Sequence, residues 1–137
     1  MKSNIIRKFK KEDIDELVSI LKMNEQYDYP EIEGPEAMLR VAMCDAALFL
    51  VAENEEKAVG FIKAIYDGSR AFIHILSVHP AFQKSGIGMA LVESAIKEFK
   101  KRGAPSISVT VSESSMGFWE KISFEKLPIS LMLRSFD

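Results

Sequence analysis

Residues 83–88 (QKSGIG) hold two glycines and a lysine at the point where a helix is expected to begin. The first N–H groups of a helix have no intrahelical partner, and the helix dipole adds partial positive charge there. Gly86 and Gly88 lack a Cβ, so phosphate oxygens could reach those N–H groups, and Lys84 adds a charge nearby. The segment therefore predicts a backbone cradle for a pyrophosphate, although two glycines alone also fit a turn that merely opens a packed helix.

Two other phosphate motifs do not fit these residues. The chain contains no G-x-x-x-x-G-K-[ST], which excludes a P-loop. A dinucleotide fingerprint would need glycine or alanine at Leu91, and it would follow a parallel strand, whereas the strands expected before residue 83 are antiparallel. The cradle, if present, belongs to another kind of fold.

His74 is the best candidate for a general base. A histidine pKa near neutrality suits it to accept a proton from an amine, directly or through water. Strand alternation predicts that His74 lies on the same face as Leu76 and Val78. The alternative is a histidine that is hydrogen-bonded in or near the core, and both interpretations stay open. His79, which precedes Pro80, is expected to be a structural loop residue.

Composition limits the class of protein. The 137 residues predict one domain, residues 1–137, with 47% hydrophobic and 28% charged residues, as in an ordinary soluble protein. A net charge of −2 without a long run of one sign gives no support for nucleic-acid binding. Cys44 is the only cysteine, and we find no signal-peptide pattern and no apolar run of membrane-spanning length, so a cytoplasmic protein is expected. Two histidines and one cysteine, without H-x-x-x-H or C-x-x-C spacing, predict no metal site.

The elements that must position these residues follow from the spacing of apolar residues. Apolar residues at helical spacing predict a helix over residues 13–22, and Pro35 opens a short second helix to about residue 43. Between them, residues 24–36 are acidic and aromatic and are expected to form an irregular connection. Three apolar runs, joined by a polar turn and a hairpin signal, predict an antiparallel meander of strands over residues 47–52, 58–66 and 71–78. Gly60 inside the second strand suggests a bulge or a close approach by another backbone.

A helical pattern returns after Pro80. One apolar stripe that includes Phe99 predicts a helix that begins near residue 87 and ends at Gly103, with the charged residues among 97–102 on its solvent face. A strand over residues 106–111 should be parallel to the third strand, because a helix connects the two. A short helix over residues 115–121 and a last strand over residues 129–133 complete an α+β fold, a mixed sheet with helices on both faces. That last strand could be a sheet edge that pairs in a homodimer.

Residues 76–88 (LSVHPAFQKSGIG) resemble the acyl-CoA-binding motif of the GNAT N-acetyltransferases, whose signature is Q/R-x-x-G-x-G/A. Residues 117–124 (GFWEKISF) resemble a later segment of that family, F-Y-x-K-x-G-F, and the order of elements agrees along nearly the whole chain. The resemblance implies a GNAT-like fold and direct transfer of an acetyl group from acetyl-CoA to an amine, without a metal. The implied partner is a small-molecule or peptide amine acceptor.

The resemblance also implies roles for particular residues. In this family the pantetheine arm pairs with the strand before the loop, here at Leu76 and Val78, and the N–H groups of residues 83–89 hold the pyrophosphate. The arylalkylamine N-acetyltransferases carry a functional histidine where His74 stands, whereas Phe72 replaces the glutamate base of the protein-lysine acetyltransferases. The implied cofactor-binding residues are Leu76, Ser77, Val78, Gln83, Lys84, Ser85, Gly86, Ile87, Gly88, Met89, Ser112 and Trp119.

The second motif departs from the family at three positions. Trp119 stands where a tyrosine usually protonates the leaving thiolate, and an indole N–H donates a hydrogen bond but has no usable acidity. Ser112, the second candidate catalytic residue, stands where an asparagine often contacts the cofactor, and Ser123 replaces a glycine. Three alternatives remain. The thiolate leaves unassisted, or a hydroxyl of Ser112, a neighbouring serine or a nearby tyrosine assists it, or catalysis is lost and the chain is a CoA-binding regulatory or interaction module.

Residues 27–36 lie where the family places part of its acceptor pocket. Their negative charge would favour a cationic amine, although a solvated loop is an equally open interpretation. Specificity resides in variable loops, so the resemblance does not name the acceptor.

Overall fold

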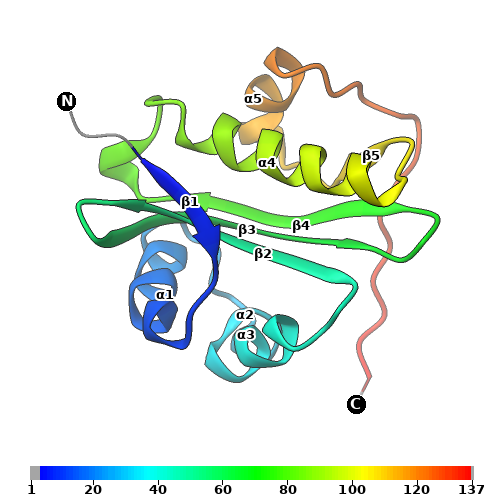
Figure 1. Cartoon of the computed structure of the whole chain (residues 1–137). Helices are drawn as coiled ribbons and strands as arrows, with labels where there is room; N and C mark the ends of the chain where they lie inside the picture. Colours follow the sequence, from blue (N-terminus) through cyan, green and yellow to red (C-terminus); the bar gives the residue numbers. More distant parts are fainter. Residues whose placement is uncertain (1–3, 137) are drawn as a thin grey trace.

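Five strands form one mixed sheet between two layers of helices in the computed structural model, which describes residues 4–136 (Figure 1). Helices α4 and α5 cover one face, and α1, α2 and α3 lie against the other. The strands follow one another across the sheet as β1 (Ile5–Lys8), β2 (Ala47–Asn54), β3 (Lys57–Tyr66), β4 (Ala71–Val78) and β5 (Ile107–Val109). The helices are α1 (Ile14–Met23), α2 (Pro30–Glu33), α3 (Pro35–Ala42), α4 (Ile87–Arg102) and α5 (Met116–Lys121), with 3-10 turns at η1 (Lys11–Asp13), η2 (Pro80–Phe82) and η3 (Glu113–Ser115).

The antiparallel meander and the parallel crossover are both confirmed. β2, β3 and β4 pair antiparallel in chain order, and β5 lies parallel to β4. The sequence did not predict β1, which pairs antiparallel with β2 at the opposite edge of the sheet. Its four residues, IIRK, are too few for a period of two to be recognised.

Gly60 of β3 lies where two backbone constraints meet. The pairing of β2 with β3 shifts after Ala52 and Gly60, which leaves Val59 without a partner. A Cβ at Gly60 would lie 3.1 Å from the carbonyl oxygen of Ser77 on β4. The bulge and the close backbone approach, the two alternatives for this glycine, are therefore both present.

The predicted helices are confirmed with small shifts at their ends. α4 ends where predicted, because Gly103 adopts a φ of 104° and its N–H donates to the carbonyl oxygen of Lys100 at 3.0 Å. Inside the connection expected to be irregular, Pro30 opens the four-residue α2, which the sequence did not predict. None of the helices within residues 4–136 is long and apolar enough to cross a bilayer.

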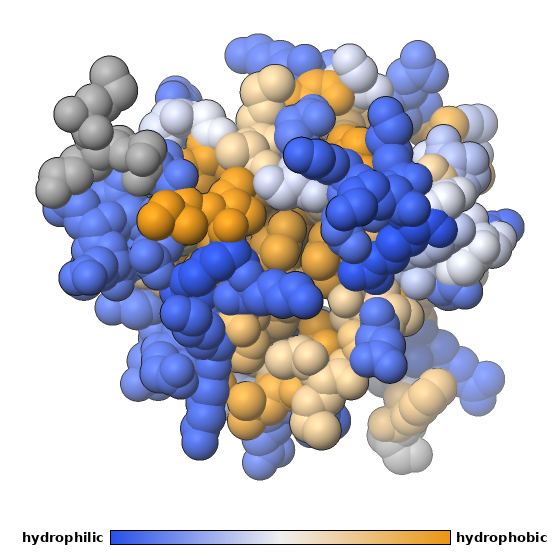
Figure 2. All heavy atoms as spheres, viewed as in Figure 1, coloured by the Kyte–Doolittle hydropathy of each residue, from blue (hydrophilic) through white to orange (hydrophobic). Residues whose placement is uncertain are grey.

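Two apolar clusters hold the helices to the sheet. The α4-side cluster includes Phe99 and Trp119, and the α1-side cluster includes Leu17, Met38 and Phe61. Burying a side chain of this size contributes roughly 1.5–3 kcal/mol relative to leaving it in water. Figure 2 shows polar residues over much of the surface, with apolar residues in the band between the two helical layers.

The strand predicted over residues 129–133 is wrong. Residues 124–136 contain no helix or strand, and no backbone hydrogen bond within the described part of the chain involves residues 125–136. A strand needs a neighbour for its N–H and C=O groups, and none of the five described strands pairs with this segment. Apolar composition alone therefore gave a false strand.

Candidate functional site

Strand β4, which carries most of the predicted site residues, loses one of its two neighbours halfway along. Its first part is paired with β5, through Ala71 with Ile107, Phe72 with Ser108 and Ile73 with Val109. No pair with β5 follows Ile73, whereas pairing with β3 continues to Val78. β5 itself ends at Val109, so from residue 74 onward β4 has no strand on this side, and we call this free stretch of edge the opening.

A β-bulge lies at the point where the opening begins. Lys63 of β3 pairs with Ile75, but the next residue, Ala64, pairs with Ile73, so His74 is left without a partner. A bulge inserts one residue and moves the following side chains to the opposite face. Accordingly Ile73 belongs to the α4-side cluster, whereas Ile75 packs against the α1-side cluster.

The bulge corrects one prediction about His74. Leu76 and Val78 pack with the α4-side cluster, whereas the ring of His74 lies beside that of Phe72, with centroids 5.5 Å apart. The charges of Lys63 and Glu33 act on His74, and Lys63 lies over Phe49 of the α1-side cluster, so His74 faces the α1 side. The prediction that His74 shares a face with Leu76 and Val78 is therefore wrong, because simple alternation does not hold across a bulge. His74 is instead placed at the apex of the opening, where β4 leaves β5.

A buried ion pair faces the same side of the sheet as His74. Lys63 is only 4% exposed, and its Nζ is paired with Oε1 of Glu33 on α2. His74 is exposed, but the protein around its ring removes part of its water, and this desolvation lowers its pKa below the ordinary value of 6.5. The charge of Lys63 lowers the pKa further, and Glu33 acts in the opposite direction. His74 is therefore neutral at neutral pH, the form that accepts a proton.

The outward edge of β4 beyond the bulge is held by amide side chains. The N–H of His79 donates to the carbonyl oxygen of Val59 on β3 at 2.8 Å, so by alternation the backbone groups of Leu76 and Val78 point away from β3. Val78 O accepts from Nδ2 of Asn24 at 2.8 Å and from Nε2 of Gln83 at 3.0 Å. Side-chain donors thus take the place that a neighbouring strand would have at Val78.

Ser77 connects this edge to the segment that follows α1. Its side chain is 2% exposed, and its Oγ donates to Oε1 of Gln26 at 2.6 Å and accepts from Nδ2 of Asn24 at 2.9 Å. Nε2 of Gln26 also makes a long contact, 3.4 Å, to the carbonyl oxygen of Leu76. Sequence reasoning missed Asn24 and Gln26, and no local pattern could have indicated them because they are about 50 residues from their partners.

The loop before α4 has the backbone conformation of an anion cradle. Lys84 and Gly86 both have positive φ, 65° and 91°. The first α4 N–H with a partner is that of Ala90, which donates to Gly86 O at 3.0 Å. The N–H groups of Ile87, Gly88 and Met89 precede it and remain available to an anion. Residues 83–86 are exposed, as an anion site requires, and the Ile87 side chain is buried beneath them.

The structure brings the two motifs together. A Cβ on Gly88 would lie 3.3 Å from Cζ of Phe118 on α5 and 3.7 Å from Cδ2 of Leu76 on β4. A Cβ on Gly86 would meet nothing within 4 Å. Gly88 therefore permits close packing of three elements, whereas Gly86 is required by its φ and faces open space.

Trp119 lies inside the α4-side cluster rather than on the surface. It is 6% exposed, and its ring meets those of Phe118 and Phe124 edge to face, each with centroids 5.1 Å apart. The Trp119 side chain is therefore part of the hydrophobic core. A contact between Trp119 and the cofactor stays a prediction.

Ser112 lies three residues after the end of β5 and directly before η3. Its Oγ is exposed and lies 3.2 Å from Oγ of Ser114 and 3.0 Å from Oγ of Ser115. Three hydroxyls close together can each donate or accept. The structure therefore groups the serines that the sequence offered in place of the missing tyrosine.

The acidic residues 27–36 were expected to contribute to an acceptor pocket. Among them, Glu33 is paired with Lys63, and the role of its acidic neighbours stays a prediction.

Within residues 4–136, no group of three or more histidine, cysteine, aspartate or glutamate side chains lies where it could hold a metal ion.

Comparison with known proteins agrees with this geometry. A model of the acetyltransferase (GNAT) family matches residues 14–124. A transcriptional regulator from Bacillus halodurans C-125 is 26% identical, with a TM-score of 0.82 over 97% of this chain and 100% of that chain. PaiA N-acetyltransferase from Thermoplasma acidophilum, solved with coenzyme A, is 23% identical, with a TM-score of 0.82 over 93% of each chain. Glucosamine-6-phosphate N-acetyltransferase from Arabidopsis thaliana is 19% identical, with a TM-score of 0.76 over 98% of this chain and 99% of that chain.

The family match covers the opened strand, the loop and both motifs, which are the parts that the sequence singled out. The chain therefore belongs to the acetyltransferase (GNAT) family, the acyltransferases whose donor is acetyl-CoA.

Proposed function

We propose that this chain, acting as one domain, transfers the acetyl group of acetyl-CoA directly to a primary amine of a small molecule or peptide. The observation that carries the proposal is the opening of the sheet after Ile73, which leaves the outward groups of Leu76 and Val78 next to the loop over residues 83–88. An extended arm that starts with a pyrophosphate at the loop would follow β4 toward His74. Four residues of strand span about 13 Å along that path.

In the proposed reaction the amine nitrogen attacks the thioester carbonyl carbon. A C–N bond forms, the C–S bond breaks, and the products are an amide and the CoA thiolate. The amine gives up one proton and the thiolate takes one, so no oxidant, reductant or metal is consumed. The protein must hold both reactants, accept the first proton and stabilise the departing sulfur.

His74 is the proposed acceptor of the amine proton. It lies at the bulge, where the opening begins, and its neutral form predominates at neutral pH. Its exposed side chain can reach an acceptor or an intervening water. The Lys63–Glu33 pair keeps α2 against this face of the sheet.

Ser112 is the proposed partner of the leaving thiolate. A serine hydroxyl is too weak an acid to give its proton to the thiolate. Its O–H can donate a hydrogen bond to the sulfur, while water supplies the proton. Ser114 and Ser115 orient that hydroxyl through their own Oγ atoms. The buried Trp119 leaves the usual tyrosine role to this group.

A second candidate is a CoA-binding regulatory module with little or no transferase activity. One observation favours it: the residue at the usual tyrosine position is an indole packed in the core. The likeness to a solved transcriptional regulator is consistent with such a role.

The two candidates differ in one measurable product, free CoA thiol. The chain would be mixed with acetyl-CoA and a panel of primary amines that includes polyamines, amino sugars and short peptides, and thiol release would be compared with a no-protein control. We expect at least one amine to raise release well above the control, and His74→Ala to remove that increase. Acetyl-CoA binding in a calorimeter without thiol release for any amine would favour the module, and no binding at millimolar acetyl-CoA would contradict both candidates.

A further inference from the structure

The carbonyl oxygen of Val78 already has two hydrogen-bond donors. Nδ2 of Asn24 donates to it at 2.8 Å and Nε2 of Gln83 at 3.0 Å, so both lone pairs of this oxygen are in use. The proposed donor arm would run past the same oxygen, because it lies on the outward edge of β4. An amide N–H of the arm can therefore reach this carbonyl only if one of the two side chains gives up its place.

Asn24 is the firmly held member of the pair. It is half-buried, its Nδ2 also donates to Oγ of Ser77 at 2.9 Å, and its Oδ1 accepts from Nε2 of Gln83 at 3.1 Å. Its backbone N–H donates to the carbonyl oxygen of Ile20 at 3.0 Å, at the end of α1. Both polar atoms of the side chain and the backbone N–H thus have partners, and moving Asn24 would break all of these bonds.

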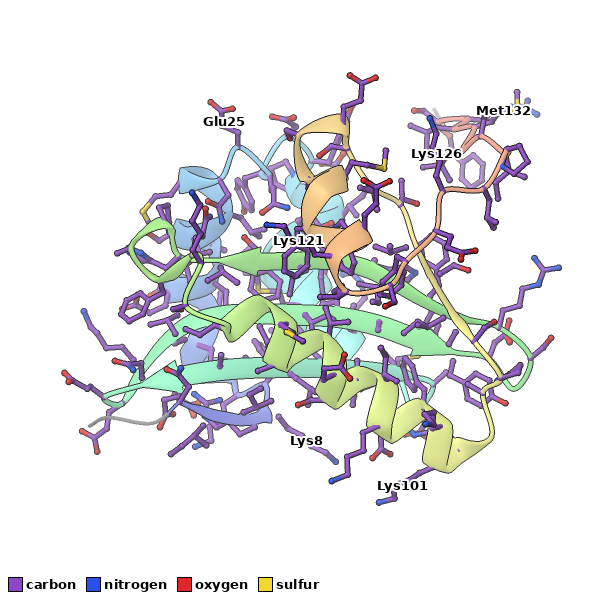
Figure 3. The ribbon with its side chains drawn as sticks, turned by 90° about the horizontal axis from the view of Figure 1, so that it is seen from above. Lys8, Glu25, Lys101, Lys121, Lys126 and Met132 are labelled. Carbon is purple, nitrogen blue, oxygen red and sulfur yellow. The ribbon has the colours of Figure 1, made fainter. Side chains whose placement is uncertain are left out.

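The turn after α1 is fixed in a conformation that directs amide side chains at β4. Glu25 has a φ of 57°, and its N–H donates to the carbonyl oxygen of Lys22 at 3.2 Å. The next N–H, that of Gln26, donates to the carbonyl oxygen of Leu21 at 2.8 Å. These two bonds form a Schellman motif, in which glycine usually stands where Glu25 is found. Seen from above, Glu25 and Lys8 of β1 lie on opposite sides of the strands, so the turn is on the β4 side of the sheet (Figure 3).

Gln83 is the more weakly held member of the pair. Its side chain is exposed, and it donates through Nε2 to Val78 and Asn24. Its backbone N–H makes only a long contact, 3.4 Å, to the carbonyl oxygen of Pro80. Of the two donors on Val78, Gln83 is therefore the one that an incoming amide would displace.

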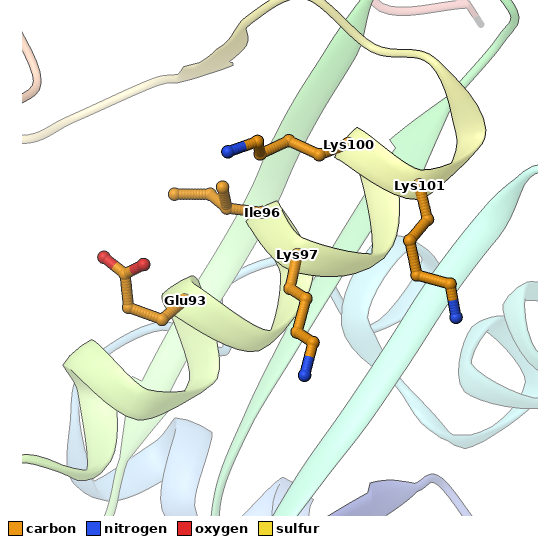
Figure 4. Close-up of a pocket in the computed structure, with 5 residues that line it drawn as sticks. All are labelled: Glu93, Ile96, Lys97, Lys100 and Lys101. Carbon is orange, nitrogen blue, oxygen red and sulfur yellow. The ribbon is translucent and has the colours of Figure 1, made fainter.

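A hollow on the outer face of α4 is a second place that an arm leaving the loop could follow. It has a volume of about 440 Å³, and all of its lining residues belong to α4: Glu93, Ile96, Lys97, Lys100 and Lys101. Figure 4 shows Ile96 and Lys100 on one side of the helix and Lys97 on another. The hollow offers charged and apolar side chains but few backbone groups, because those of a helix interior bond to one another. An arm that carries amides therefore has pairing partners along β4 and not along this hollow.

We propose that Asn24 and Gln83 form an amide latch on Val78, and that donor binding exchanges the Gln83 amide for an amide N–H of the donor arm while Asn24 stays in place. This inference rests on the proposed function, since it concerns the same donor site. The exchange keeps two donors on the Val78 carbonyl, so no acceptor is left without a partner. It requires an amide in the arm, which the pantetheine of CoA supplies and a simple alkyl thioester does not. The latch therefore selects donors by their arm, independently of the pyrophosphate.

The first test compares two substitutions on the same carbonyl by calorimetry with CoA. Gln83→Met keeps the length of the side chain but removes the amide, so no protein donor has to be displaced. The dissociation constant of CoA should then fall about three- to ten-fold, the effect of one hydrogen bond. Asn24→Ala removes the fixed member and loosens the edge of β4, so the dissociation constant should rise by a similar factor. A Gln83→Met variant that binds CoA no more tightly than wild type would overturn the latch.

The matched control for Gln83→Met is a second ligand. 3′-phospho-ADP has the nucleotide and the pyrophosphate of CoA but no arm, so its affinity should be the same for Gln83→Met and wild type. Equal changes for both ligands would show that the Gln83 side chain acts on the phosphates, which overturns the latch. Absence of CoA binding by the wild-type chain would contradict the proposed function as well, whereas CoA binding without the opposite effects of the two substitutions would contradict the latch alone.

The second test follows the side-chain amide resonances of the wild-type chain. CoA should move the Nε2 resonances of Gln83 toward those of a glutamine in water, and it should leave the Nδ2 protons of Asn24 protected from hydrogen exchange. 3′-phospho-ADP should change neither side chain. Gln83 resonances that stay in place at saturating CoA, or shifts confined to residues 93–101 along the hollow, would overturn the proposal.

Discussion

The two halves of β4 have the same apolar character but different surroundings. Residues 71–73 have a strand on each side, whereas residues 75–78 have β3 on one side and amide side chains of Asn24, Gln26 and Gln83 at the outward edge. The difference begins at one unpaired residue, His74. A strand that lacks one neighbour along half of its length can therefore offer an edge to an extended ligand, while amide side chains occupy part of the place of the missing strand.

The largest effect is expected from filling the space beside the open half. Gly86→Trp places an indole where the pyrophosphate would lie, and it should raise the dissociation constant of acetyl-CoA by roughly 100-fold or more. The matched control is Gly68→Trp in the β3–β4 turn, since both glycines have positive φ, 91° and 100°, and open space around a Cβ. Both variants should lose about 1–2 kcal/mol of stability from that backbone strain, but only Gly86→Trp should lose binding in calorimetry. Equal affinities for the two variants would remove the loop from the site.

Loss of the residue at the boundary between the halves should affect turnover rather than binding. His74→Ala is expected to lower kcat about 10²- to 10⁴-fold, the usual contribution of a general base, with acetyl-CoA affinity within about two-fold of wild type. The wild-type rate should fall as pH drops through the pKa of His74, which lies below 6.5. A His74→Ala enzyme with an unchanged pH–rate profile would exclude His74 as the base.

Substitutions in the Lys63–Glu33 pair should move the pH at which the rate falls, the acid limb of the pH–rate profile, in opposite directions. Lys63→Met removes the charge that lowers the pKa of His74 and leaves Glu33, which raises it, so the limb should move to higher pH. Glu33→Gln leaves Lys63 unopposed, so the limb should move to lower pH. The pH dependence of kcat/KM, followed together with thermal unfolding to detect loss of fold, measures both shifts. Shifts in the same direction would show that local unfolding, and not charge, causes them.

The smallest effect concerns the amide side chains along the open half. Ser77→Ala removes a buried hydroxyl that accepts from Asn24 and donates to Gln26, and it should cost about 1 kcal/mol in the free energy of unfolding. Asn54→Ala, which removes an exposed hydrogen bond to Asn4, is the control and should stay within about 0.5 kcal/mol of wild type. Denaturant unfolding measures both, and a loss at Asn54 as large as that at Ser77 would show that the network does not stabilise the edge.

The sequence predicted most elements because their apolar periods are long and clear. Helix α4 and strands β2 to β4 all lie within a few residues of their expected ends. It failed where a partner decides the structure: residues 129–133 have strand composition but no neighbour, and β1 has a neighbour but only four residues.

Within the site, the local motif was readable and the tertiary contacts were not. The loop at residues 83–88 has its own conformational signature, and the φ of Gly86 agrees with it. The face of His74 depends on a bulge defined by β3, and Asn24 reaches Val78 across 54 positions in the chain. The spacing of residues within one segment therefore could not predict the face of His74 or the contact between Asn24 and Val78.

The most direct test of the central claim is to follow backbone amide resonances while acetyl-CoA is added. We expect large shifts at residues 75–78 and 84–89. Residues 71–73, where β5 already occupies the edge, should shift no more than residues far from the site. Shifts that spare residues 75–78 and 84–89, or an equal response from both halves of β4, would contradict this expectation.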